Sequence, residues 1–573
     1  MHNFLALSTL HKYDWWILCG TLIFIVFYGV YKTRKNKNVT DYLKGGNDAR
    51  WWTIGLSVMA TQASAITFLS TPGQAFHDGM GFVQFYFGLP IAMVIICLVF
   101  IPIYHKLKVF TAYEYLEGRF DIKTRTLAAL LFLTQRGIGA GITIFAPSII
   151  LSAVLGWNLL YLNIIIGILV IIYTVSGGTK AVSVTQKQQM AVIFLGLFVT
   201  FLLILNYLPL DISFSKALDI AGANDKMKVL DFSFDWENRY TFWSGIIGGT
   251  FLALSYFGTD QSQVQRYLSG RSLKESQMGL IFNGLLKVPM QFFILLVGVM
   301  VFVFYQFNSS PLHFNPAAVN DVMASEYAEQ YQDLETEKEA LDLQLAEKQI
   351  SYAKINDTSE EKEQLLEEIK IINITKDELR EQSKELIKQA NPDAETNDKD
   401  YVFIHFILNQ LPRGLIGLLL AVILSAAMSS TASELNALGS TTTIDLYKRN
   451  IQGRTEKHYV RASKWFTLLW GVIAILVACI ANLFENLIEL VNIIGSIFYG
   501  NVLGIFLLAF FVKFVKSKAV FIAALITQAI IIYVWWIDVM PYLWLNLVGC
   551  ALVMGIAIFL QVFIGMPSQK KAS

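Results

Sequence analysis

Long apolar segments, each near the length of a membrane-crossing helix, dominate the pattern of hydrophobic and polar residues. A helix needs about 20 apolar residues to cross the hydrocarbon core of a bilayer. Strands of a β-barrel would instead alternate over about ten residues, and the sequence lacks such alternation. The pattern predicts an all-α polytopic membrane protein with about thirteen spans. We place them near residues 14–31, 52–75, 82–104, 127–152, 158–175, 189–208, 241–260, 277–306, 413–439, 462–482, 487–512, 519–537 and 541–565.

Basic residues are concentrated in alternate short loops between these predicted spans. They gather after the first, third, fifth, seventh, ninth and eleventh spans, for example in residues 32–44 and 448–464. Several loops of the other set contain no Lys or Arg, namely 76–81, 153–157, 483–486 and 538–540. Cytoplasmic loops of membrane proteins are enriched in Lys and Arg. We therefore expect the N-terminus outside the cell and the C-terminus in the cytoplasm.

Residues 320–396 interrupt the apolar pattern with a densely charged segment. Its apolar residues recur near heptad spacing in two stripes, one from Tyr327 to Tyr352 and one from Leu365 to Leu386, with a polar break around residues 356–359 between them. This pattern predicts an antiparallel helical hairpin outside the membrane. We expect transporter-type membrane regions at 1–319 and 397–573, separated by this insertion. The hairpin is interpreted either as an accessory stalk or as a docking site for an external partner.

Composition supports a lipid environment. The chain has 573 residues, of which 55% are hydrophobic and only 16% are charged, against about a quarter charged in soluble proteins. Its 45 Lys and Arg almost balance 44 Asp and Glu, so the net charge indicates neither a nucleic-acid nor an acidic partner. We expect the lipid bilayer, and no nucleic acid, as a partner. The first apolar run lacks a basic leader and a cleavage site, so we keep it as a span. The predicted location is the inner (plasma) membrane.

Small and polar residues interrupt two spans, as in transporters that bind solutes at discontinuous helices. The second span contains residues 57–67 and then Thr71-Pro72-Gly73, and the seventh contains 245–249 and then 255–261. The ninth span adds hydroxyls on successive helical faces, in residues 425–433. Sodium, a hard cation, prefers such oxygens, but the hydroxyls could instead join helices or bond to their own backbone.

Four motifs in order resemble the solute:sodium symporter family. They are AAMSSTASELNALGSTTTIDLYK (426–448), LKVFTAYEYLEGRF (107–120), GTDQSQVQRYLSGRS (258–272) and IIGSIFYGNVLGIFLLAFF (493–511). The resemblance covers roughly residues 10–565 apart from 320–396. It implies the inverted five-plus-five repeat of the bacterial leucine transporter (LeuT type), with one helix before the ten-helix core and two after it.

The resemblance also implies a sodium site between the first and eighth core helices. Its ligands would be backbone carbonyls and hydroxyls of Ala60, Ala63, Ala426, Ser429 and Ser430. Some family members hold a second sodium ion with an aspartate and further serines. The corresponding positions here are Gln186 and Ala432, which argue against a second ion. We therefore expect one sodium ion per solute.

Solute contacts are expected from the same core helices. Sugar-carrying relatives use acidic and amide side chains where this sequence has Ile66, Thr67, Tyr86 and Ala253, so a hexose is disfavoured. The predicted solute-binding residues are Gln62, Ser64, Thr67, Tyr86, Arg136, Tyr256, Lys287 and Asn492.

Two of these residues are cations at membrane depth, Arg136 and Lys287. A charge there costs several kcal/mol unless it is paired or hydrated. Arg136 suits a carboxylate through two parallel hydrogen bonds, but it is equally interpreted as a structural partner; Asp260 could pair with a cation. The favoured function is sodium-coupled uptake of a small organic anion, such as a monocarboxylate, sialic acid or vitamin acid. The alternatives are a sugar, polyol or amino-acid symporter and, more distantly, a transporter-like sensor; an enzyme is not expected.

Overall fold

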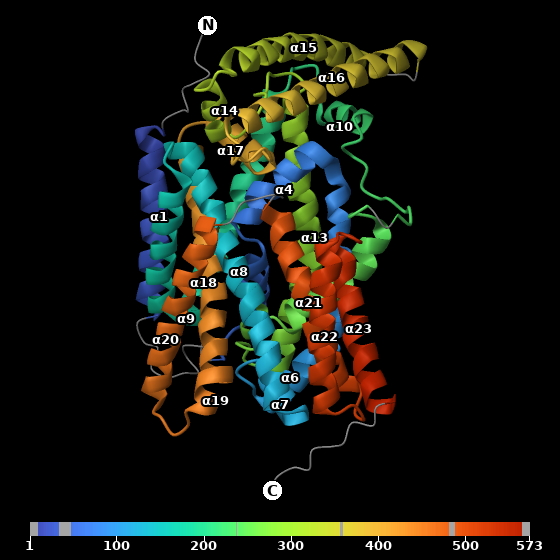
Figure 1. Cartoon of the computed structure of the whole chain (residues 1–573). Coiled ribbons are helices and arrows are strands. Elements are labelled where there is room, and N and C mark those ends of the chain that lie inside the picture. Colours follow the sequence, from blue (N-terminus) through green and yellow to red (C-terminus); the bar gives the residue numbers. More distant parts are fainter. Residues whose placement is uncertain (1–9, 34–46, 236–237, 356–358, 481–486, 564–573) are drawn as a thin grey trace.

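The computed structural model describes residues 10–33, 47–235, 238–355, 359–480 and 487–563. These residues form a bundle of long, roughly aligned helices, and a pair of helices, α15 and α16, lies across one end of the bundle (Figure 1). We call this end the hairpin end and the opposite one the far end.

The helices of the first half are α1 (Lys12–Thr33), α3 (Trp51–Gln62), α4 (Ala65–Asp78), η1 (Gly79–Tyr86), α5 (Gly88–Ile95), η2 (Ile96–Phe100), α6 (Ile101–Leu107), α7 (Glu114–Arg119), α8 (Ile122–Leu155), α9 (Leu159–Tyr207) and α10 (Phe214–Ala223). Then follow η3 (Ser244–Gly248), α11 (Gly249–Gly258), α12 (Gln261–Tyr267), α13 (Leu273–Phe304), α14 (Pro316–Met323), α15 (Ala328–Lys354), α16 (Glu360–Ala390), α17 (Lys399–Gln410), α18 (Leu415–Thr441), η4 (Thr442–Tyr447), α19 (Lys448–Asn450), α20 (Glu456–Ile480), α21 (Leu487–Phe511), α22 (Ser517–Trp536) and α23 (Tyr542–Phe563).

The helices have the length and apolar character of membrane spans. Among the described residues, nine helical segments are long and apolar enough to cross a bilayer, and two shorter apolar helices, Leu159–Ile172 and Ser244–Gly258, accompany them. Large apolar side chains such as Leu98, Ile172 and Trp465 are exposed on the bundle surface, as lipid contact requires. These findings confirm the all-α membrane class. The number of thirteen spans and the orientation remain predictions.

One element differs in form from the sequence-based expectation. Residues 158–208 were expected to form two spans, whereas the structure has one helical element, α9, of 49 residues. The Asn163 side chain donates to the Ala478 carbonyl at 3.0 Å near the hairpin-end terminus of α20. The Tyr207 ring lies 6.5 Å from the ring of Phe304, also near the hairpin end. Since a straight helix of this length would extend over about 70 Å, we infer that α9 turns back on itself and crosses the bundle twice.

The charged insertion forms the expected helical hairpin of α15 and α16. Side chains from both predicted stripes are buried between its helices or against the bundle, among them Tyr331, Leu345, Ile369 and Leu379. Most of the predicted polar break lies outside the described residues. The hairpin lies across the bundle end instead of projecting away from it (Figure 1), because polar contacts join it to the bundle. Asn373, for example, donates to the Asn224 side chain at 2.7 Å.

Both predicted helix interruptions are present. The helix α3 ends at Gln62 and α4 begins at Ala65, and α11 ends at Gly258 before α12 begins at Gln261. A helix end leaves backbone carbonyls and N–H groups without intrahelical partners. Both interruptions therefore place free backbone polar groups and short polar side chains inside the bundle.

Candidate transport site

A small cavity lies between the two interrupted helices, and we call it the central cavity. Its volume is about 70 Å³. Seven of the eight predicted solute-binding residues line it, and Lys287 is the exception. The lining consists of Thr61, Gln62, Ser64, Ile66, Thr67, Phe85, Tyr86, Arg136, Thr143, Leu252, Tyr256, Glu434, Ile488, Val491, Asn492 and Tyr499. Side chains far apart in the sequence thus form one site, because α3, α4, η1, α8, α11, α18 and α21 converge on it.

Arg136 is held by two carboxylates at the floor of the central cavity. Its guanidinium forms an ion pair with Asp260 at the α11–α12 interruption, and a second with Glu434 of α18 at 3.0 Å. It also donates to the Tyr499 hydroxyl at 2.6 Å. Two carboxylates face one guanidinium, so this cluster offers no excess positive charge to a solute. These contacts pair Asp260 with a cation, as expected, and the role of Arg136 in solute binding stays a prediction.

Glu434 was not among the predicted site residues. Besides binding Arg136, it accepts a hydrogen bond from the Thr143 hydroxyl at 2.8 Å, and both residues line the central cavity. The signal was available in the sequence, because a carboxylate in the middle of an apolar span is costly without a partner. Glu434 directly follows the hydroxyl-rich stretch 425–433 of the ninth predicted span.

Lys287 lies behind the wall of the central cavity. Its ammonium group is 5.6 Å from the ring centre of Tyr86, which lines the cavity. The side chain is fully buried in the middle of α13, and within the described residues its ammonium group has no hydrogen-bond partner. One helical turn to either side, Asn283 and Gln291 also carry buried oxygen atoms without such a partner in the described structure. Within the part of the chain that the structure describes, Lys287 therefore differs from Arg136 in having no ion pair with a carboxylate.

The predicted sodium ligands lie at the α3–α4 interruption and on the neighbouring α18. Ala63 caps α3, so the carbonyls of the preceding turn, including that of Ala60, lack the N–H partners of a continuing helix. On α18, the buried Ser429 hydroxyl has no hydrogen-bond partner in the described residues. The Ser430 hydroxyl donates to the Ala426 carbonyl at 3.0 Å. Neutral oxygens without strong partners fit a hard monovalent cation, which we treat as a transported co-substrate.

Gln186 of α9 bridges α3 and α18 beside these oxygens. Its Nε2 donates to the Thr61 hydroxyl at 3.2 Å and to the Ser433 hydroxyl at 3.5 Å, while its Oε1 accepts from Ser57 at 2.6 Å. Ala432 is buried nearby on α18 and supplies no oxygen side chain. An amide N–H group therefore lies at the position that the resemblance associates with a second cation.

Polar residues close the central cavity toward the hairpin end. Glu489, one turn from Asn492 on α21, accepts from the Tyr240 hydroxyl at 2.6 Å and pairs with Arg239 at 3.3 Å. Gln74 of α4 donates to Asp78 at 2.6 Å and to Glu489 at 3.5 Å. We call Gln74, Asp78, Arg239, Tyr240 and Glu489 the outer gate, because the predicted orientation places the hairpin end outside the cell. These residues line a second cavity of about 540 Å³ on the hairpin side.

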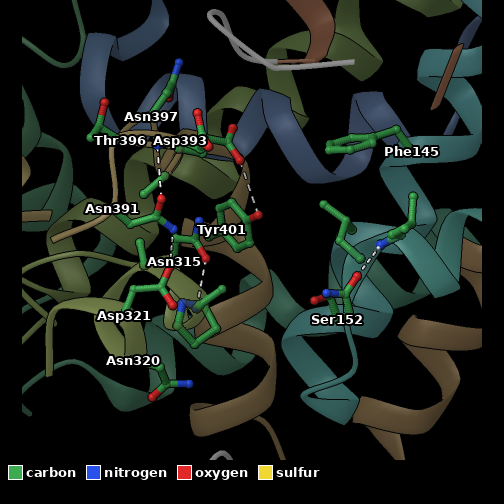
Figure 2. A pocket seen from close by; sticks show the side chains of 18 of the residues that line it. Phe145, Ser152, Asn315, Asn320, Asp321, Asn391, Asp393, Thr396, Asn397 and Tyr401 are labelled. Atoms are coloured by element: carbon green, nitrogen blue, oxygen red, sulfur yellow. Dashed lines mark hydrogen bonds between the residues drawn. The ribbon is translucent and has the colours of Figure 1, made fainter. Parts of the chain in front are cut away.

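A third and larger cavity, of about 940 Å³, lies beside the attachment of the hairpin. Figure 2 shows Asn391, Asp321 and Tyr401 on one side of it, and Ser152 and Phe145 on the other. None of the predicted sodium or solute residues lines this cavity in the described structure. Size alone does not make it the transport site; the smaller central cavity has the interrupted helices and the buried charges.

Comparison with known proteins agrees with this geometry. The model of the "Sodium:solute symporter family" matches residues 42–329 and 386–527, well over half of the chain. The chain belongs to the sodium:solute symporter family. The family match omits residues 330–385, which lie within α15 and α16, so the hairpin is an insertion relative to the family model.

Relatives carry several kinds of solute. The chain is 26% identical over 525 residues to "Sodium-coupled monocarboxylate transporter 1" of Xenopus laevis, covering 91% of this chain and 71% of that protein. It is 26% identical over 510 residues to "Sodium/sialic acid symporter SiaT" of Proteus mirabilis, covering 87% and 84%. It is 25% identical over 487 residues to the human "Sodium/iodide cotransporter", covering 84% and 63%.

The fold has a counterpart among solved structures. A substrate-bound, outward-open Na+-coupled sialic acid symporter superposes with a TM-score of 0.74 at 23% identity, covering 96% of this chain and 98% of that chain. This similarity confirms the predicted fold. Family membership confirms the predictions of sodium-coupled solute transport and of a multi-pass membrane transporter that is not an enzyme.

Proposed function

We propose that this symporter carries a small monocarboxylate together with one sodium ion into the cytoplasm. The observation that carries the proposal is Lys287, a fully buried ammonium group without a partner in the described residues, next to the cavity-lining Tyr86. An unpaired charge in the membrane interior costs several kcal/mol. A bound carboxylate would remove this cost, whereas a neutral solute would not.

The size of the central cavity favours a compact anion. At about 70 Å³ it holds roughly two water molecules, each of which occupies about 30 Å³ in the liquid. A short carboxylic acid needs far less rearrangement to enter than a sialic acid. Apolar residues at the cavity, such as Leu252 and Val491, suit its short carbon chain.

Sodium binds, in this proposal, at Ala60, Ala63, Ala426, Ser429 and Ser430. Five neutral oxygens would lie at the junction between α18 and the interruption that separates α3 from α4. A sodium ion bound there would join α18 to the interrupted helix and so favour the form that is open to the outside. Loss of sodium to the cytoplasm would loosen the junction and release the solute. One sodium ion and one monocarboxylate carry no net charge together, so the sodium concentration gradient, and not the membrane potential, drives this cycle.

The stoichiometry follows from Gln186. Its amide N–H group bonds Thr61 and Ser433, so these hydroxyls are occupied as acceptors. We therefore assign one sodium ion to each solute, and we expect a Hill coefficient near 1 for sodium. We assign the protein to the plasma (inner) membrane, with residues 1–319 and 397–573 as the transporter domain and 320–396 as its extramembrane insertion.

The proposal is tested by uptake into proteoliposomes with and without an inward sodium gradient. Labelled lactate, butyrate, sialic acid and glucose would be compared for the wild type, Lys287→Gln and the charge-preserving Lys287→Arg. We expect sodium-dependent uptake of the short acids, its loss in Lys287→Gln and partial recovery in Lys287→Arg. Sodium-driven uptake of glucose alone, or equal acid uptake by Lys287→Gln, would overturn the proposed cargo.

A further inference from the structure

The hairpin is attached to the transporter through a buried ion pair at its base. Asp398, between α16 and α17, accepts two hydrogen bonds from Arg380 of α16, at 3.0 and 2.8 Å. It also accepts from the Phe314 backbone N–H at 2.8 Å. The third neighbour is His77 of α4, with its Nε2 at 3.8 Å from the carboxylate. One buried carboxylate therefore contacts both the hairpin and an interrupted membrane helix.

The charge of this carboxylate depends on its surroundings. Burial alone would raise the pKa of Asp398, but Arg380, with weaker contributions from His313 and His77, holds the pKa well below its ordinary value. Asp398 is therefore ionised at neutral pH. Removal of Arg380 would leave a buried charge without its main partner, which is strongly destabilising locally.

The next residue extends the attachment to the end of α4. Lys399 donates to Asp78, the last residue of α4, at 2.7 Å. The two backbones also touch, because a Cβ atom added at Gly73 of α4 would lie 1.8 Å from the Lys399 carbonyl oxygen. No side chain fits at Gly73 while α17 keeps this position. The hairpin-side half of α4 is thus fixed to residues 398–399.

Movement of α4 would reach both the outer gate and the central cavity. Gln74 and Asp78 of the outer gate are on α4, and Thr67, one turn after its start, lines the central cavity. The carbonyl of Ala63, a proposed sodium ligand, lies directly before this helix. One helix of 14 residues, with Pro72 in its interior, therefore connects the hairpin attachment with the sodium junction.

The attachment has open space on one side. The connection from α16 to α17, residues 391–397, borders the 940 Å³ cavity (Figure 2), so on that side it is held by specific polar contacts more than by packing. Asn391, which donates to Asp321 at 2.8 Å, is one of these contacts.

We infer that Arg380 and Asp398 are positioning residues for transport: they let the inserted hairpin hold α4 and keep the outer gate closed. This inference rests on the proposed function only in treating α4 as an element that moves during transport. It predicts that loss of Arg380 opens the outer gate, because α4 is released from the hairpin.

The test is thiol labelling of a cysteine beneath the outer gate, with no solute present. Val491→Cys lines the central cavity and would be placed in a Cys19→Ser, Cys479→Ser background. The buried Cys97 and Cys550 remain as reporters of unfolding. Labelling with a membrane-impermeant maleimide would be compared for this protein alone and with Arg380→Gln, Arg380→Lys, Lys399→Gln or Lys348→Gln. Lys348 forms an exposed ion pair with Glu368 within the hairpin, at 2.5 Å, and is the matched control.

We expect Arg380→Gln to speed labelling of Val491→Cys roughly tenfold, as for a gate shifted by about 1.4 kcal/mol. Lys399→Gln should give a smaller increase, Arg380→Lys a rate near that of the parent, and Lys348→Gln no change, with Cys550 protected throughout. An unchanged rate in both Arg380→Gln and Lys399→Gln would overturn the inference, as would equal labelling of Cys550. Because no solute is used, failure here is separate from failure of the Lys287 proposal.

Discussion

Two basic residues in the membrane region, Arg136 on α8 and Lys287 on α13, are both buried in the middle of long helices but have opposite electrostatic surroundings. Arg136 contacts Asp260, Glu434 and Tyr499. Lys287 has only aromatic contact with Tyr86 among the described residues. Arg136 lines the cavity yet is neutralised, whereas Lys287 stands behind the wall and is not.

The difference shows that proximity to a cavity does not by itself identify the residue that binds an anion. A guanidinium that already has two carboxylates gains little from a third. An unpaired ammonium group gains the full benefit of a counter-ion in a medium where few water molecules reach it. We therefore propose that Arg136 organises the site and that Lys287 recognises an anion.

The largest expected effect comes from breaking the Arg136 cluster. Arg136→Gln leaves Asp260 and Glu434 buried without their cation and should lower the free energy of unfolding by about 3–5 kcal/mol. Thermal melting in detergent would measure this loss, and Arg136→Gln combined with Glu434→Gln should recover part of it. A normal melting temperature together with selective loss of acid transport would show that Arg136, after all, binds the solute.

Removing the Lys287 charge should act on transport more than on folding. Lys287→Gln should reduce kcat/KM for a short monocarboxylate by roughly 100-fold, as expected for about 2–4 kcal/mol from a buried charged hydrogen bond. Its melting temperature should stay the same or rise, because an unpaired buried charge is removed. Initial rates of uptake check the first statement, and a strongly destabilised Lys287→Gln would argue for a hidden structural partner.

The transported cation offers a third case, because sodium is coordinated by neutral oxygens and not by a carboxylate. Ser429→Ala removes one proposed ligand and should raise the sodium concentration for half-maximal uptake roughly tenfold, equivalent to about 1.4 kcal/mol. Ser440→Ala is the matched control on the same helix, since the Ser440 hydroxyl bonds only within α18, to the Ala437 carbonyl at 3.0 Å. Equal sodium dependence in the two variants would remove Ser429 from the site.

The smallest expected effect is a change of hairpin stability with pH, which arises from a buried lysine outside the membrane. Lys338 of α15 pairs with Asp342 at 2.7 Å, but burial lowers its pKa to about 8. The unfolded hairpin therefore binds more protons than the folded one between pH 8 and about 10.4, and hairpin stability should rise with pH by about 1 kcal/mol from pH 8 to 9. Chymotryptic cleavage after the buried Tyr331 should slow over this interval and should be independent of pH in Lys338→Met. Faster cleavage of the wild type at pH 9 than at pH 8 would contradict the buried environment assigned to Lys338.

Much of this architecture was predictable because membrane helices leave strong patterns in the sequence. The interruptions near Ala63 and Asp260 were visible as clusters of small and polar residues, and the hairpin as a charged heptad pattern. The two passes of α9 through the bundle were predictable from its two apolar runs. The helical backbone between the two runs was not, because hydropathy carries no information about it.

Partnerships between distant residues were not predictable. Nothing near Arg136 in the sequence indicates that Asp260 and Glu434 meet it, because those pairs depend on how three helices pack. The Arg380–Asp398 attachment was hidden for the same reason, and so was the isolation of Lys287. The sequence shows which charged residues lie within predicted membrane spans, but the role of each residue depends on its neighbours in the folded structure.

The central claim is that Lys287 recognises the negative charge of the solute. Its most direct test is binding of lactate and of lactamide, which have nearly the same shape but differ in charge, to the purified wild type, Lys287→Gln and Lys287→Arg in the presence of sodium. We predict that the wild type and Lys287→Arg bind lactate at least roughly 30-fold more tightly than lactamide, and that Lys287→Gln binds the two compounds equally, as loss of about 2 kcal/mol of charge recognition requires. A preference for lactate that persists unchanged in Lys287→Gln would contradict the claim.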